Sequence, residues 1–165
     1  MFTFVRGLSS RAMSRAFVKE DDDAVEDLPE RPISTAPNLV TAKGFAAIEA
    51  EVARLSEELA RVGDDRAARA RIARDVRYWT ARRGSAHVQP PPPDCSIVRF
   101  GCTVTLDRDD GRSQTFRIVG EDEADPEKGT LSHVSPLARA LMGKEIGDSV
   151  TVTGHELEIA NIGQK

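Results

Sequence analysis

An apolar stripe with alternating three- and four-residue gaps runs through the first half of the chain. This spacing places the side chains on one side of a helix and is typical of a coiled-coil seam. Charged residues fill most positions between them, as expected of a helix face in water. The stripe therefore predicts a helix packed against a second helix. Its members are Phe45, Ile48, Val52, Leu55, Leu59 and Val62.

The second helix is expected after a break at Gly63. This glycine suits the left-handed residue that ends many helices. Asp64 or Asp65 can cap the next helix by accepting hydrogen bonds from its unpaired N–H groups. Each arm would be about 30 Å long at 1.5 Å per residue, so the hairpin is a short rod with two carboxylates at its far end. The answering stripe comprises Ala68, Ile72, Val76 and Trp79.

Arginine dominates the second arm, in which Asp75 is the single acid. Arginines three or four positions apart share one side of a helix. Beside Tyr78 and Trp79, such a basic face can bind a phosphate backbone. The alternative is a solvated face that pairs with glutamates of the first arm, and composition does not separate the two. The candidate nucleic-acid-facing residues are Arg66, Arg69, Arg74 and Arg77.

Acidic and proline-rich segments flank this hairpin, which we assign to residues 38–84. In residues 1–37, acids crowd together and prolines interrupt regular structure. Such a run cannot bury enough apolar surface to offset its ordering entropy. We expect a disordered acidic leader; the alternative is an acidic arm that folds back on a basic surface. After the hairpin, four consecutive prolines predict a semi-rigid linker over residues 85–96.

Beyond the linker, the periodicity changes from helical to strand-like. Turn residues separate short alternating segments, and Ser135-Pro136 predicts the cap and first turn of a short helix that continues to Leu141. Residues 97–165 are therefore expected to form a small α+β domain, with antiparallel strands and one helix on a face. The expected strands are residues 102–106, 115–119, 129–133, 149–153 and 156–159.

Charge and cysteine content restrict the classes of function. The net charge of −4 argues against general nucleic-acid affinity for the whole molecule. Cys95 and Cys102 show no zinc-type spacing, so free thiols in a reducing cytosol are expected, and a disulfide or a metal site is the alternative. No apolar run approaches the roughly 20 residues needed to cross a bilayer. We expect a cytoplasmic monomer with no membrane contact and no cofactor of its own.

Three blocks after the linker, residues 98–101, 116–126 and 135–148, closely resemble the carboxy-terminal domain of the GreA/GreB transcription elongation factors. Residues 38–45 and 76–78 extend the resemblance into the hairpin. It implies an FKBP-like domain that docks on the rim of the secondary channel of bacterial RNA polymerase. It also implies a coiled coil that reaches towards the active site and contacts RNA or DNA within the complex. The polymerase-binding residues that it implies are Asp122, Ser135, Pro136, Leu137, Ala138 and Arg139.

The tip departs from the family pattern. In the cleaving members, a Gly-Asp-x-Ser-Glu-Asn motif presents carboxylates that help to hold a second magnesium and a water. Gly63-Asp64 matches its beginning, but Arg66 and Ala67 stand at the serine and glutamate positions. The arms also look shorter, and about ten fewer residues per arm would withdraw the tip by about 15 Å.

These departures predict a non-enzymatic regulator that is similar to the Rnk-type regulators and binds RNA polymerase. Magnesium would then be present only in the polymerase active site. Two alternatives remain open. One is a transcript-cleavage factor that uses Asp64 and Asp65. The other is a Gre-like domain that binds a different protein.

Overall fold

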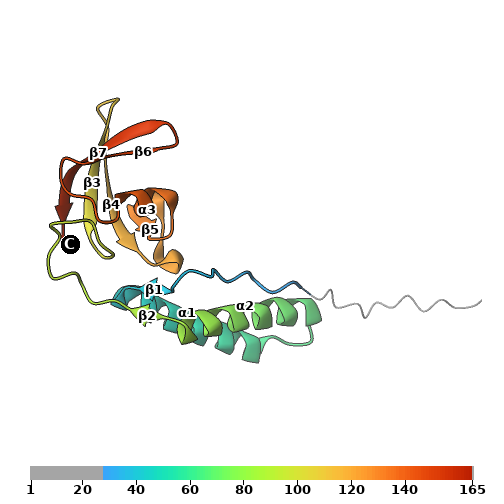
Figure 1. Ribbon diagram of the computed structural model, residues 1–165. Coiled ribbons are helices and arrows are strands. Elements are labelled where there is room, and N and C mark those ends of the chain that lie inside the picture. The colour runs from blue at the N-terminus through green and yellow to red at the C-terminus, as the bar shows by residue number, and fades with distance from the viewer. Residues whose placement is uncertain (1–27, 165) are drawn as a thin grey trace, which may run out of the picture.

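A computed structural model describes residues 28–164 of the chain. A hairpin of two helices, α1 (Ala42–Arg61) and α2 (Arg66–Gly84), projects from a curled sheet that carries one short helix (Figure 1). The expected α+β fold class, with a helical hairpin followed by a small sheet domain, is confirmed. The greater part of the expected acidic leader, residues 1–27, lies outside the described residues.

Helix α1 forms where the apolar stripe predicts it. Thr41 caps its start, and the Thr41 hydroxyl accepts a hydrogen bond of 3.0 Å from the Gly44 N–H. The stripe residues Ile48, Val52 and Leu55 are buried against the rest of the molecule. The answering stripe of α2 is only half-buried, because a rod of two helices has no further layer to cover it.

The turn between the helices differs from expectation at Gly63. Helix α1 ends with an extended cap residue, Val62, and Gly63 is not among the glycines with positive φ. Arg69 accounts for this, because its guanidinium donates to the carbonyls of Val62 (3.0 Å) and Gly63 (3.3 Å). The two carbonyls that directly follow α1 thereby find a donor without a left-handed residue.

The larger sheet has five strands in the order β5-β4-β3-β7-β6. Its antiparallel pairs are β3–β4, β3–β7 and β6–β7, but β5 pairs with β4 in parallel. The sheet is therefore mixed, which corrects the expectation of a wholly antiparallel one. Two short 3-10 helices, η1 (Glu121–Glu123) and η2 (Pro126–Lys128), carry the chain back between β4 and β5. The strands are β3 (Thr103–Arg108), β4 (Ser113–Val119), β5 (Thr130–Ser132), β6 (Ser149–Val152) and β7 (His155–Gly163).

Helix α3 (Pro136–Leu141) begins with Ser135 as its cap and Pro136 in its first turn, as the sequence predicts. Leu141 and Ala138 are fully buried, and they join the core formed by inward-facing residues of the strands. The opposite side of α3 is exposed. Packing thus fixes one face of α3 and leaves the other available for contacts.

Cys95 and Cys102 form a disulfide, so the expectation of free thiols is wrong. The chain turns sharply between them: Gly101 has a φ of 88°, and the Cys102 N–H donates to the Arg99 carbonyl. This turn brings the two Cα atoms to 6.1 Å, well within bridging range. The sequence spacing alone does not indicate such a turn.

The segment between hairpin and sheet packs against both. Strands β1 (Leu39–Val40) and β2 (His87–Val88) pair in parallel at the base of the hairpin. Further along, Pro92 is buried, and its carbonyl accepts a hydrogen bond from Gln164. Of the helices within residues 28–164, none has the length and apolar character to span a membrane.

Candidate functional site

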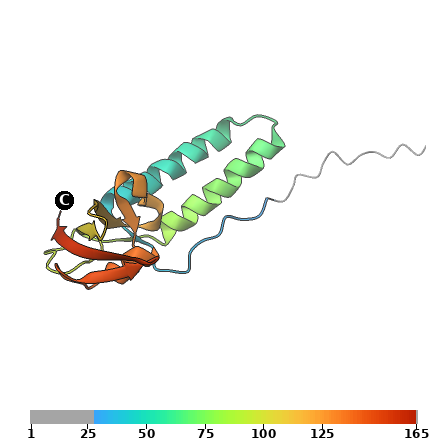
Figure 2. The same ribbon diagram turned by 90° about the horizontal axis from the view of Figure 1, so that it is seen from above.

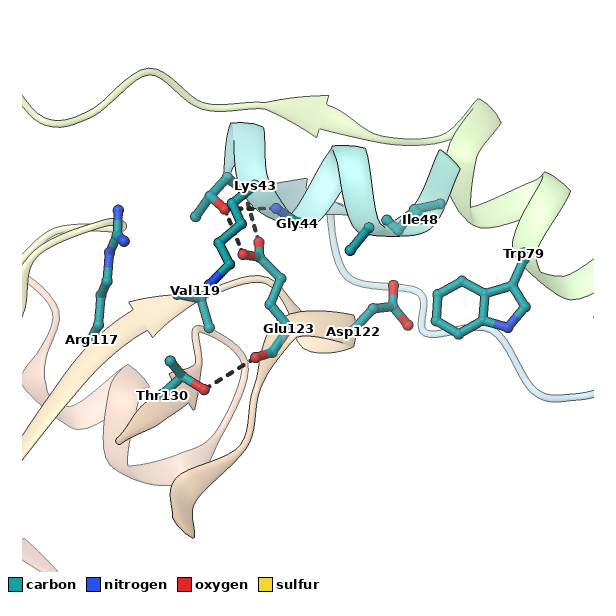
Figure 3. Close-up of a pocket in the computed structure, with 11 residues that line it drawn as sticks. Lys43, Gly44, Ile48, Trp79, Arg117, Val119, Asp122, Glu123 and Thr130 are labelled. Carbon is teal, nitrogen blue, oxygen red and sulfur yellow. Dashed lines mark hydrogen bonds between the residues drawn. The ribbon is translucent and has the colours of Figure 1, made fainter. Parts of the chain in front are cut away.

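The 3-10 helix η1 lies where the base of the hairpin meets the sheet domain. Figure 3 shows the Glu123 side chain reaching towards the first turn of α1, while Asp122 points towards α2. We call Asn38, Thr41, Arg82, Asp122 and Glu123 the hairpin clamp, because hydrogen bonds join these residues across the two parts of the chain.

Glu123 holds the start of α1. Its carboxylate accepts hydrogen bonds from the Thr41 N–H (2.7 Å), the Thr41 hydroxyl (2.5 Å) and the Gly120 N–H (3.2 Å). A negative charge at this end of α1 is also favoured by the helix dipole. The approach requires glycine at position 44, since a Cβ there would lie 2.0 Å from the carboxyl carbon of Glu123.

Asp122 holds the end of α2. Its carboxylate accepts from the Arg82 Nε at 2.6 Å and from the Tyr78 hydroxyl at 3.0 Å. Arg82 is only 2% exposed and also donates to the Asn38 side-chain oxygen at 2.7 Å. A buried guanidinium needs such partners, because an unpaired charge in the interior is costly.

This arrangement gives Asp122 an internal role, and the polymerase contact that the resemblance implies for it remains a prediction. Its side chain is 9% exposed. It also changes the environment of Tyr78: burial raises the pKa of the Tyr78 phenol, and the nearby negative charge of Asp122 acts in the same direction.

A cavity of about 250 Å³ lies between the hairpin and the sheet domain (Figure 3). Ile48, Trp79 and Val119 contribute its apolar surface, while Lys43 and Arg117 bring positive charge. The acids at its edge already bind the hairpin. Within residues 28–164, no group of three or more His, Cys, Asp or Glu residues is placed to hold a metal. The cavity has the composition of a contact surface between two structural units.

The two acids at the hairpin tip are both exposed but have different surroundings. Asp65 caps α2, and its carboxylate accepts a hydrogen bond of 2.9 Å from the Ala68 N–H. Asp64 precedes the cap. By themselves they do not provide the ligand set of a magnesium site, which usually needs several oxygen ligands in octahedral geometry.

The arginines expected to face nucleic acid are placed differently from one another. Arg69 binds carbonyls at the end of α1, and Arg74 lies 3.5 Å from Asp75. Arg77 pairs with Glu30, and Arg66 is exposed. Contact of this face with RNA or DNA remains a prediction.

The expected polymerase-binding block forms α3 and its start. Pro136 and Arg139 are exposed, Leu137 is half-buried against the core and Ala138 is buried. The Ser135 hydroxyl accepts from the Ala138 N–H at 3.2 Å. Just after the helix, Met142 is 41% exposed and Ile146 is 57% exposed, although both are large apolar residues. Sequence reasoning did not single out these two, and the composition of the block offered no signal for them.

Sequence reasoning also missed the clamp, because it treated the arginines of the second arm as one basic face and did not single out Arg82. One signal was present. A glycine in the first turn of a predicted helix costs helix stability, so Gly44 indicates that something approaches the helix closely at that point.

Residues 93–164 match the model of the family described as "Transcription elongation factor, GreA/GreB, C-term". The transcription elongation factor GreA of Ruegeria pomeroyi is 35% identical over 134 residues, which cover 68% of this chain and 86% of the relative. The GreA of Hyphomonas neptunium is 59% identical over 58 residues, but these span only 34% of this chain and 37% of the relative.

Among solved structures, the prokaryotic transcription elongation factor GreA/GreB from Nitrosomonas europaea matches with a TM-score of 0.38 and 19% identity. The match covers 76% of this chain and 98% of that structure.

These matches correct one expectation. The relatives are named GreA. The family that the chain resembles includes members that stimulate transcript cleavage. The expectation of a non-enzymatic regulator, drawn from the departures at the tip, is therefore wrong.

Proposed function

The chain belongs to the GreA/GreB family of transcription elongation factors, and on that premise we propose that it binds bacterial RNA polymerase at the secondary channel and modulates elongation. The sheet domain would dock on the rim of the channel and the hairpin would enter it. This role places the chain in the bacterial cytoplasm.

The exposed side of α3 carries the proposal. Arg139, Met142 and Ile146 leave a cation and two large apolar side chains uncovered on one short stretch. None of the other residues within 28–164 pairs with Arg139. Exposed apolar side chains beside an arginine are typical of the centre of a protein–protein interface. We therefore assign polymerase docking to residues 135–146.

The hairpin clamp supports insertion of the rod. A hairpin can be aimed into a channel only if its base is held at a constant angle. Arg82 and Glu123 provide this by fixing the end of α2 and the start of α1 to the same 3-10 helix. Binding energy from docking is then not lost in ordering the hairpin.

Core RNA polymerase binding tests the docking assignment directly. We expect Arg139→Glu to weaken binding by at least tenfold in fluorescence anisotropy, because the substitution replaces a cation at the interface with an anion. Arg112→Glu is the matched control, since Arg112 is exposed in the β3–β4 turn and its change in charge is identical. Equal affinities for the two variants would reject docking through α3.

The relatives named GreA favour a second role, stimulation of transcript cleavage by the polymerase. Asp64 is the carboxylate at the tip that the cap of α2 does not use. On a backtracked elongation complex, we expect RNA shortening with the native chain and less shortening with Asp64→Ala. A variant that binds polymerase normally and cleaves as the native chain does would remove Asp64 from this role.

A further inference from the structure

The ten residues before the hairpin, 28–37, lie along α2 (Figures 1 and 2). In chain order, they run from the tip side of α2 towards its base (Figure 1). Asn38 donates to the Arg82 carbonyl at 2.8 Å, Arg31 lies beside Asp75, and Glu30 lies beside Arg77. The chain thus follows α2 in the parallel sense.

Side-chain contacts hold this segment in place. The Arg31 guanidinium lies 3.3 Å from the Asp75 carboxylate and 3.8 Å from the centre of the Tyr78 ring, a cation–π contact. Glu30 accepts a hydrogen bond of 2.9 Å from the Arg77 Nε. This bond lowers the pKa of Glu30, and the positive charges of Arg77 and Arg74 act in the same direction.

Two further arginines of α2 lie between the contact with Glu30 and the hairpin tip. Arg74 and Arg71 are four and seven residues before Tyr78, so all three lie on one side of α2. The Arg74 Nε is buried without a hydrogen-bond partner among the described residues. Arg71 is exposed, and no acid within residues 28–164 pairs with it. Because Arg74 also lies 3.5 Å from Asp75, the described chain neutralises this part of the basic surface only in part.

The sequence immediately before Glu30 has the complementary charge and length. Residues 20–27 contain Glu20, Asp21, Asp22, Asp23, Glu26 and Asp27. Arg77 and Arg71 are about 9 Å apart along the helix axis at 1.5 Å per residue. Three extended residues cover about 10 Å, so the acids start within reach of both Arg74 and Arg71.

We propose that residues 20–27 are the ligand of this arginine surface, docking on α2 in cis and continuing the path of residues 28–37. The surface of α2 that Arg71 and Arg74 form is then shielded from other polyanions in the free chain. The acidic arm and an RNA or DNA strand compete for the same cations, and high salt weakens both interactions.

A zero-length cross-link tests the docking. Carbodiimide joins carboxylates to lysine but not to arginine, so Arg71→Lys introduces a reporter in the full-length chain. Arg83→Lys is the matched control, because Arg83 is exposed near the base of α2 on a different side. We expect mass spectrometry to find cross-links from Lys at position 71 to residues 20–27, and these cross-links should fall at about 0.5 M salt. Equal cross-linking at positions 71 and 83 would overturn the proposal.

A second experiment tests whether the acidic arm shields the arginine surface from RNA. It measures binding by the fluorescence anisotropy of a labelled single-stranded RNA of about 20 nucleotides. We expect Asp21→Asn/Asp22→Asn/Asp23→Asn to bind this RNA about fivefold more tightly than the native chain, and Arg71→Gln/Arg74→Gln to cancel that gain. The control neutralises three exposed acids of the sheet domain, Asp109→Asn/Glu127→Gln/Glu156→Gln. If the control gains as much affinity as the arm variant, net charge alone explains the effect and the shielding is rejected. This experiment requires no polymerase, so its failure is independent of the proposed docking at α3.

Discussion

The Nε atom of Arg82, at the end of the hairpin, lies 2.6 Å from the carboxylate of Asp122, in the connection between two sheet strands. Forty residues separate the two along the chain. Their side chains are 2% and 9% exposed, so water screens the pair poorly. This ion pair joins the helical hairpin, which has a small hydrophobic core, to the sheet domain, which has a larger one.

Removing the carboxylate should therefore be costly. We expect Asp122→Asn to lower the free energy of unfolding by about 3 kcal/mol, because it leaves the buried guanidinium of Arg82 without its main counter-charge. Urea unfolding measures the loss, with the exposed Asp109→Asn as control. A loss no larger than that of the control would show that the remaining partners of Arg82 suffice.

The same ion pair predicts a pH dependence at Tyr78, the single tyrosine of the chain. Burial, and then the Asp122 charge, raise the pKa of its phenol above the ordinary value of 10.0. The resulting stability is fully present below pH 10 and is lost as the pH rises through the raised pKa. Ultraviolet absorbance should show the native phenol ionising at higher pH than the urea-unfolded one. Asp122→Asn should reduce this difference but not abolish it, because burial remains.

Gly44 offers a test of the contact with Glu123. Alanine normally stabilises a helix by up to about 1 kcal/mol relative to glycine, but here its Cβ would meet the Glu123 carboxyl group. We expect Gly44→Ala to destabilise the chain by about 1–3 kcal/mol.

Gly84→Ala is the control, since no atom lies within 4 Å of a Cβ at that position. Glu123→Ala in the Gly44→Ala background should cost less than in the native chain, because the clash is gone. Additive losses in this double-mutant cycle would mean that the two positions do not interact.

The disulfide predicts a response to reducing agents. It closes a loop between residues seven positions apart, and a loop of that size contributes about 2–3 kcal/mol by restricting the unfolded chain. Reduction should lower the urea midpoint of the native protein and leave a Cys95→Ala/Cys102→Ala variant unchanged. An identical midpoint before and after complete reduction, verified by mass, would refute this contribution.

Local signals predicted the elements well. The stripe from Ile48 to Leu55 and the cap residue Ser135 depend only on neighbours within one or two helical turns, so the sequence displays them directly. Contacts between residues far apart in the chain produce no local pattern in the sequence. Arg82 looks like the other arginines of α2, and its burial depends on an acid forty residues away.

The candidate site divides in the same way. Helix-cap signals located α3 and the tip acids, and the resemblance to a family marked them as candidate site residues. The sequence did not predict that Met142 and Ile146 stay exposed, because apolar residues next to a core helix are usually buried. Exposure depends on tertiary contacts such as the pairing of β6 with β7, and no local pattern specifies these contacts.

Substitution of the two acids at the hairpin tip should change the stability of the chain by different amounts. Asp65 caps α2, so Asp65→Ala removes the acceptor of the Ala68 N–H and should cost about 1 kcal/mol of stability. Asp64 is exposed and lies before the cap, so Asp64→Ala should change stability by less than about 0.5 kcal/mol. Circular dichroism during urea unfolding measures both. Asp65→Asn is the matched control, because asparagine caps helices about as well as aspartate. A larger loss of stability for Asp64→Ala than for Asp65→Ala would contradict this assignment. Asp64 would then be the cap, and Asp65 would be the carboxylate left available at the tip.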